Sequence, residues 1–163
     1  MSTVDDDVII GEFRRVLDER HRVALPNEVV QFLGSDTAHA VLAKERDGCL
    51  SLWKPEAWNQ HFDKFMKNLT HRVRENLFES SRIPEVQRVA RLISTRAKAI
   101  QLGQRGRLLV PEGFREFLAV QPNTELMVIG AGVCVEIWRP AAWLDYLKSD
   151  LESFNTIFRE VAG

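Results

Sequence analysis

The sequence has few of the features that define redox, metal or membrane proteins. Its two cysteines form no C-x-x-C pair and no zinc-binding spacing. The longest stretch without a charged residue is ten residues, 126–135, against the roughly 20 needed to cross a bilayer. The acidic run Asp5-Asp6-Asp7 has the wrong charge for the start of a secretory signal. We therefore expect a reduced, cytoplasmic protein without a membrane segment.

Catalytic motifs are also missing. The chain contains no G-x-x-x-x-G-K-[ST], H-E-x-x-H or G-x-S-x-G sequence. The formal net charge of −1 excludes a chain that is basic throughout, while a hydrophobic share of 45% is sufficient for a real core. We expect a globular protein that is not an enzyme and uses neither a cofactor nor a metal. The four histidines share no ligand spacing on one obvious element: His21, His39, His61 and His71.

What the sequence does contain is an internal duplication. Residues 17–26 read L-D-E-R-H-R-V-A-L-P, and residues 102–111 read L-G-Q-R-G-R-L-L-V-P. A fixed offset of 85 positions between rare residues identifies two copies of one structural unit. The same offset aligns Cys49 with Cys134, Trp53 with Trp138, Pro55 with Pro140, and Trp58 with Trp143.

Each copy of the repeated segment predicts a charged turn that leads into a short strand. An apolar triplet that ends at proline is typical of a buried strand, because proline cannot donate to the next ladder hydrogen bond. Asp18 at the start of the first turn can accept backbone N–H groups and tighten it. Arg22 then has two compatible interpretations, an ion pair with Asp18 or a contact with nucleic acid. Arg20 and Arg105 lie within the turns, where we expect them to point away from Arg22 and Arg107 and to be freer to meet phosphate.

The remaining pattern predicts a strand–strand–helix–strand–strand order in each half. Pro55 begins a helix with apolar residues at steps of three and four, and a second helix follows a break near Ser80-Ser81. The apolar residues after Pro140 form a narrow stripe on one last helix, which favours contacts between subunits. The tryptophans related by the offset of 85 positions are expected in the core or in subunit contacts. Both cysteines are expected to be small buried residues. The expected strands are 9–17, 23–25, 40–43, 49–53, 97–102, 108–110, 126–130 and 133–138.

The pattern D-x-x-x-R, an apolar strand and proline, with W-x-P-x-x-W after each copy, resembles the MraZ family. The resemblance covers roughly residues 11–147. It implies an α+β fold of tandem AbrB-like (SpoVT-AbrB) ββαββ units that form a pseudo-two-fold swapped-hairpin β-barrel. It also implies a division into a first unit (9–54), a helical connector (55–94), a second unit (95–139) and a C-terminal helix (140–163).

The same resemblance implies a sequence-specific, DNA-binding transcriptional regulator of the division and cell-wall gene cluster. Its partners would be double-stranded DNA with direct promoter repeats and further copies of itself, assembled as a ring in the cytoplasm and nucleoid. The local surplus of six positive charges over residues 82–110 favours nucleic acid.

Both turns depart from the family pattern. His21 stands where the family usually has Gly, and we expect it to substitute for Gly in a left-handed backbone. Gly103 stands where the family has Asp, so only the first turn can hold its arginine with a carboxylate. The alternative left open is an assembly or interaction protein of this fold that has lost specific DNA binding. The expected DNA-binding residues are Arg14, Arg15, Arg20, His21, Arg22, Arg105 and Arg107, and the structural turn residues are Asp18, Gly103 and Gly106.

Overall fold

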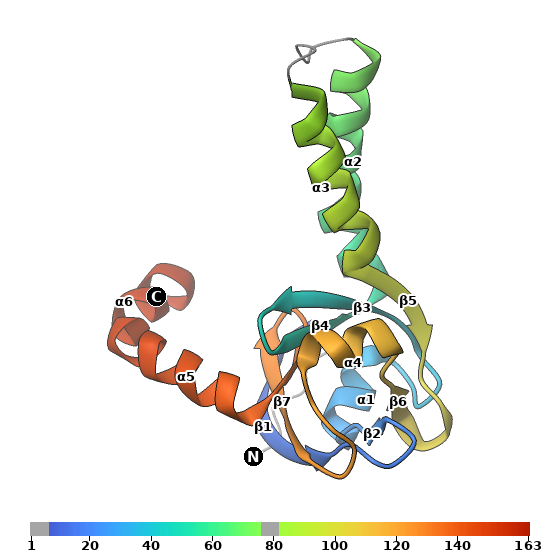
Figure 1. Ribbon diagram of the computed structural model, residues 1–163. Helices are drawn as coiled ribbons and strands as arrows, with labels where there is room; N and C mark the ends of the chain where they lie inside the picture. Colours follow the sequence, from blue (N-terminus) through green and yellow to red (C-terminus); the bar gives the residue numbers. More distant parts are fainter. Residues whose placement is uncertain (1–6, 76–81) are drawn as a thin grey trace.

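The computed structural model describes residues 7–75 and 82–163 (Figure 1). The first half contains β1 (Ile9–Val16), β2 (Arg22–Ala24), α1 (Asn27–Leu33), β3 (His39–Arg46), β4 (Cys49–Trp53), α2 (Pro55–Arg74) and α3 (Ile83–Arg96). The second half contains β5 (Ala97–Gln101), the 3-10 turn η2 (Gln104–Gly106), β6 (Arg107–Leu109), α4 (Glu112–Leu118), β7 (Glu125–Gly132), β8 (Val135–Trp138), α5 (Pro140–Asp150), the 3-10 turn η3 (Leu151–Ser153) and α6 (Phe154–Ala162).

The two copies are joined by strand pairing rather than packed as separate units. A six-stranded antiparallel sheet has the order β1-β7-β8-β4-β3-β5, and β2 pairs with β6 in a second, two-stranded sheet. The first strand of each copy therefore pairs with a later strand of the other copy: β1 with β7, and β5 with β3. The result is a mixed α+β protein with an antiparallel sheet, and each half lacks a complete sheet of its own.

One apolar core is shared by both halves. Buried residues from β1, β3, β4, β7 and β8 meet those of the two short helices α1 and α4, which cover the core from one side (Figure 1). Leu33 of α1 and Leu118 of α4, which the offset of 85 positions makes equivalent, are both buried. Burying the apolar side chains is the main favourable term for this fold, at about 25 cal/mol per Å².

The longer helices pack on the outer face of the sheet. At the start of α2, Trp58 covers β3 and packs edge-on against Trp53, with ring centroids 5.9 Å apart. At the start of α5, Trp143 packs against Trp138 of β8 at 5.3 Å, and Tyr146 extends the cluster. The offset of 85 positions thus corresponds to two equivalent aromatic attachments. The expectation that these tryptophans lie in the core or in contacts is confirmed for the core, since Trp58 and Trp138 are buried.

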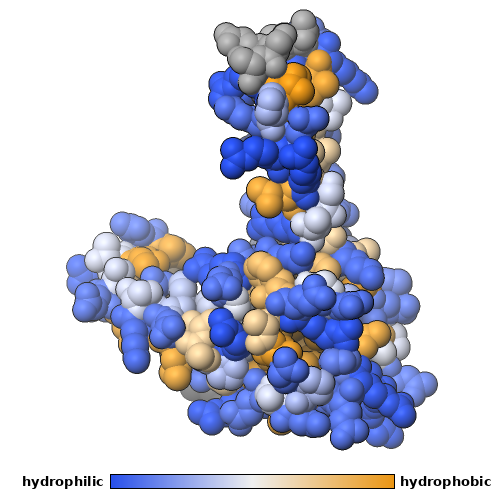
Figure 2. Space-filling model, in the orientation of Figure 1, coloured by the Kyte–Doolittle hydropathy of each residue, from blue (hydrophilic) through white to orange (hydrophobic). Residues whose placement is uncertain are grey.

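Two parts project from this body of sheet and short helices. We call α2 and α3 the helical hairpin, and α5, η3 and α6 the C-terminal arm. The hairpin rises from the end of the body away from β2 and β6, and the arm, which follows β8 in the chain, leaves the body sideways (Figure 1). Figure 2 shows apolar surface on both of these projections. Each begins at a proline, Pro55 and Pro140, which suits the first helical turn because its missing N–H is not needed there.

Most of the expected elements are confirmed, and two details differ. The strand 49–53 has the expected bounds, and the others agree within three residues. The single last helix was wrong, because a 3-10 turn at η3 separates α5 from α6. The apolar triplets are not uniformly buried, since Ala24 and Leu109 are exposed. Alternation along a strand sends such central residues to the face opposite their neighbours. The break expected at Ser80-Ser81 and most of the acidic N-terminal tail lie outside the described residues.

Candidate nucleic-acid interface

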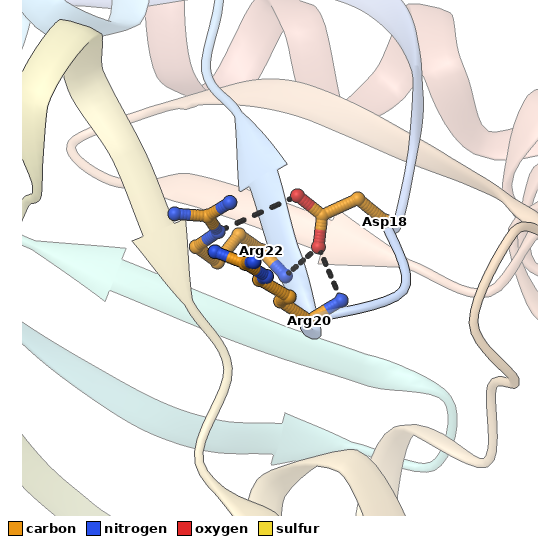
Figure 3. A network of polar contacts seen from close by, with 3 residues as sticks. All are labelled: Asp18, Arg20 and Arg22. Carbon is orange, nitrogen blue, oxygen red and sulfur yellow. Dashed lines mark hydrogen bonds and ion pairs between the residues drawn. The ribbon is translucent and has the colours of Figure 1, made fainter.

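The first turn is closed by the carboxylate of Asp18. One oxygen accepts the backbone N–H groups of Arg20, at 2.8 Å, and Arg22, at 2.9 Å. The other oxygen lies 3.4 Å from Nε of Arg22 (Figure 3). The backbone N–H of Arg22 is the largest influence that lowers the pKa of this carboxyl. The expected ion pair is therefore present as a contact between opposite charges, without a hydrogen bond from Nε, where β2 begins.

The second turn repeats the backbone of the first without the carboxylate. In the first turn the N–H of Asp18 donates to the carbonyl of Arg22, at 2.9 Å, and in the second the N–H of Gly103 donates to Arg107, at 2.8 Å. Gly103 has no side chain to accept the N–H of Arg105, and Arg105 adopts a left-handed backbone, with φ 63° and ψ 27°. Arg20, its counterpart, is not among the residues with positive φ. The loss of one acceptor coincides with a rearranged peptide inside the turn.

His21 and Gly106 hold the same left-handed position in the two turns, with φ of 61° and 68°. The expectation that His21 substitutes for Gly is confirmed by this backbone angle. Gly106 has a further reason to lack a side chain, because a Cβ there would lie 2.5 Å from Cγ2 of Val30. Arg115 takes the place of Val30 in the other copy, and His21 lies there in a shallow groove of ≈470 Å³ with Glu112 and Glu116.

The two turns meet through the ribbon of β2 and β6. The N–H of Leu25 donates to the carbonyl of Gly106 at 3.1 Å, and the N–H of Val110 donates to the carbonyl of His21 at 3.0 Å. Val23 lies opposite Leu108 at the centre of the ribbon, and both are buried. The pairing of β2 with β6 thus places two chemically different turns, far apart in sequence, next to one another.

The outward face of the ribbon carries one arginine from each copy. Arg22 lies opposite Leu109, and Ala24 lies opposite Arg107. Since directly opposed residues share a face of an antiparallel pair, these four side chains form one outward surface; both arginines are half-buried, and Leu109 is 58% exposed. Sequence reasoning missed Ala24 and Leu109. The period of two in R-V-A and R-L-L was the signal that could have found them.

Arg14 and Arg15 lie on opposite sides of β1. The guanidinium of Arg15 donates to the carbonyl of Ala24 at 3.1 Å and to that of Arg14 at 2.7 Å. Arg15 therefore links β1 to β2 and supports the ribbon from the side. Arg14 is exposed, as are Arg20 and Arg105 at the tips of the turns.

The basic stretch over residues 82–110 does not form one surface. Its first part lies on α3, which belongs to the helical hairpin and points away from the ribbon (Figure 1). There Arg82 pairs with Glu85 at 3.0 Å. Only the part from β5 onward, with Arg105 and Arg107, belongs to the region of the turns. The surplus of six positive charges is therefore divided between two distant sites.

These features define an α+β protein with two interpenetrating copies of one unit and a ribbon that presents paired arginines. Comparison with known families gives a match to the model described as "MraZ protein, putative antitoxin-like", over residues 93–162. The second half of the chain is therefore similar to the MraZ family. Within the described residues, no helix is long and apolar enough to cross a membrane.

Relatives of known name cover nearly the whole chain. The protein is 27% identical over 146 residues to the "Transcriptional regulator MraZ" of Clostridium acetobutylicum, which is 89% of this chain and 91% of the relative. It is 27% identical over 157 residues to the protein of the same name from Dictyoglomus thermophilum, with 95% and 97% covered. The corresponding figures for Alkaliphilus oremlandii are 26% over 156 residues, with 95% and 97% covered.

Proposed function

We propose that this protein is a sequence-specific, double-stranded-DNA-binding transcriptional regulator. Several relatives carry the name transcriptional regulator over almost the full length of the chain, which supports a DNA-binding role. We further propose that it acts on direct repeats in the promoter of the division and cell-wall gene cluster. It would do so in the cytoplasm, in association with the nucleoid.

The observation that carries the proposal is the outward face of the β2–β6 ribbon. The major groove of B-DNA, about 12 Å wide, admits a two-stranded β-ribbon. Arginine donates in pairs to guanine, and small apolar side chains contact the thymine methyl group. Arg22 and Arg107 on one face, with Ala24 and Leu109 between them, present both kinds of contact. Arg22 is the better candidate for a base contact because Asp18 holds its guanidinium.

The other proposed contacts surround the ribbon. Arg20 and Arg105 lie at the exposed tips of the two turns and would meet phosphates, with Arg14 beside them. Arg15 and His21 would act from the edges, Arg15 mainly by holding the ribbon. In this proposal residues 9–54 and 95–139 are AbrB-like units of a swapped-hairpin barrel, residues 55–94 connect them, and residues 140–163 form the C-terminal extension.

We propose that binding is multivalent, through a closed ring of identical subunits. A single copy with a net charge of −1 and one ribbon makes few phosphate contacts, so its own affinity for DNA is low. Several ribbons on neighbouring repeats would bind at a high effective concentration. The affinity of such a complex falls steeply with salt, because every neutralised phosphate releases counterions.

Footprinting on the DNA upstream of the protein's own gene tests the function. We expect protection at repeated, evenly spaced sites, lost in Arg22→Ala. Probes with several repeats should bind much more tightly than a probe with one repeat, and each should weaken as salt rises. Equal affinity for one and several repeats would refute the multivalent mechanism. Absence of any salt-dependent retention on DNA would instead favour an assembly protein that no longer binds DNA.

A further inference from the structure

The helical hairpin has an apolar groove that its own chain leaves open. Within the described residues, the groove measures ≈430 Å³ and is lined by Trp58, Phe62 and Phe65 of α2 and by Val89, Leu92 and Ile93 of α3. Leu92 is 71% exposed and Phe65 is 43% exposed. Aromatic and aliphatic side chains gathered in a concave surface are typical of a docking site for a protein segment.

The C-terminal arm carries a second exposed apolar surface, away from the groove. Phe154 and Phe158 lie one helical turn apart on α6, with ring centroids 5.7 Å apart, and they are 59% and 54% exposed. Leu151, Ile157 and Val161 continue the exposed apolar surface of the arm. The arm leaves the body well away from the groove (Figure 1), so these aromatic rings do not fill the groove of their own chain.

The charges of the two parts are opposite. On the helical hairpin, residues 82–96 contain four arginines against one glutamate, a surplus of three positive charges. On the arm, residues 140–163 contain four carboxylates against two basic residues, a surplus of two negative charges. Arg96 lies at the edge of the groove, and Glu152 and Glu160 lie on the exposed arm. Complementary charges around apolar centres are the arrangement expected of two surfaces that bind each other.

We propose that the groove of each subunit receives α6 of a second copy of this chain, with Phe154 and Phe158 inserted between α2 and α3. This assignment rests on the proposed homo-oligomer and names its interface. Hairpin and arm are attached at equivalent places on one sheet, Trp58 and Trp143, so every subunit has one donor and one acceptor. Such a head-to-tail contact joins successive subunits, and it gives a closed ring where the rotation between neighbours closes.

The arginines of α3 then serve assembly and not DNA binding. They face a neighbour's acidic arm, while the ribbon of β2 and β6 at the other end of the body remains open for DNA. This accounts for the division of the basic stretch between two distant sites. It also separates the residues that set the oligomeric state from those that set DNA sequence preference.

Mass measurement by analytical ultracentrifugation tests the interface with two variants, Leu92→Glu in the groove and Phe158→Glu on the arm. Both positions are exposed, so the fold of the subunit is retained, as circular dichroism will verify. Each variant alone should be monomeric at a concentration where the unmodified protein is an oligomer. Val133→Glu, an equally exposed apolar-to-acid change on the body, is the matched control and should keep the full mass.

Mixing the two variants gives the decisive result. Leu92→Glu keeps an intact arm and Phe158→Glu keeps an intact groove, so an equimolar mixture should form a heterodimer and stop there. If the unmodified protein is a monomer, the proposed oligomer itself fails. If it is an oligomer that neither variant dissociates, only this interface is refuted. If Phe158→Glu dissociates it and Leu92→Glu does not, the arm binds another arm, and the groove assignment is overturned.

Discussion

His21 and Gly106 occupy equivalent positions in the two turns, and the carbonyl of each accepts a backbone hydrogen bond from the other copy. The carbonyl of His21 accepts the N–H of Val110, and the carbonyl of Gly106 accepts the N–H of Leu25, at 3.0 and 3.1 Å. Both residues need a left-handed backbone to present those carbonyls. The duplicated turns are therefore symmetric in their backbone contacts, while only the first has a carboxylate. The consequences of that difference can be measured.

The first prediction separates the roles of the two ribbon arginines. Arg22→Ala should abolish discrimination between specific and scrambled DNA, with the loss of a base contact worth about 1–3 kcal/mol at one position. Arg107→Ala should weaken binding evenly across sequences, because its guanidinium has no turn carboxylate to fix it. Competition assays at fixed salt measure both, with the mass of each variant as a control. Loss of discrimination in Arg107→Ala alone would reverse the assignment.

The second prediction concerns the backbone of the turns. Arg105 has a left-handed backbone, which costs a residue with a side chain about 1 kcal/mol. Arg105→Gly should therefore raise the free energy of unfolding, by up to about 1 kcal/mol. Arg20→Gly is the matched control and should lower it by about 0.5–1 kcal/mol, because glycine adds freedom to the unfolded chain. Urea denaturation without DNA gives both values. Equal losses in the two variants would show that the turns do not differ.

The third prediction follows from Asp18. Its pKa is lowered, chiefly by the backbone N–H of Arg22, so its charge stabilises the folded state above the ordinary value of 3.8. That stability disappears as the pH falls through the lower folded pKa. Asp18→Asn keeps an oxygen for the N–H groups but loses the charge, so it should melt earlier than the unmodified protein at pH 7. The difference in Tm should shrink below pH 3.8, and a constant difference would contradict this assignment.

The fourth prediction concerns Glu136, where removal of the carboxylate charge should raise stability instead of lowering it. Glu136 of β8 accepts the indole N–H of Trp138 at 3.0 Å, and burial is the main cause of its raised pKa. A raised carboxyl pKa means that ionisation lowers stability as the pH rises past the folded value. Glu136→Gln keeps the acceptor without the charge, so it should be more stable than the unmodified protein at pH 7. The advantage should vanish below pH 4.5, the ordinary value, in thermal unfolding followed at several pH values.

Most of the fold could be predicted from the duplicated sequence, because short local patterns of residues determine its strands and turns. The apolar pattern and the Asp-Gly turn located residues 49–53, and proline marked the start of each longer helix. His21 was predicted to replace a glycine because the family that the sequence resembles usually has Gly at that place. Comparison of two copies within one chain supplied the information that a single unit would not.

The rest could not be predicted because it depends on contacts across the chain. Nothing between Asp150 and Phe154 is Gly or Pro, so the interruption of the arm has no marker in the sequence. The exposed ribbon face, with Ala24 and Leu109, depends on pairing between β2 and β6. Arg15 was expected to meet DNA, and its hydrogen bond to Ala24 depends on how β1 passes the ribbon. The missing acceptor at Gly103 was visible, while its effect on Arg105 was not.

The exchange of strands between the copies also sets the order in which the chain can fold as it is made. Ile9 pairs with Gly132 at one edge of the sheet, and His39 pairs with Gln101 at the other. Closure of such distant pairs is slow, because loop entropy is lost before the contacts form. β1 therefore cannot find its neighbour until β7, residues 125–132, has left the ribosome. Until then the first half has an incomplete sheet, and its folding depends on the second repeat of the same chain.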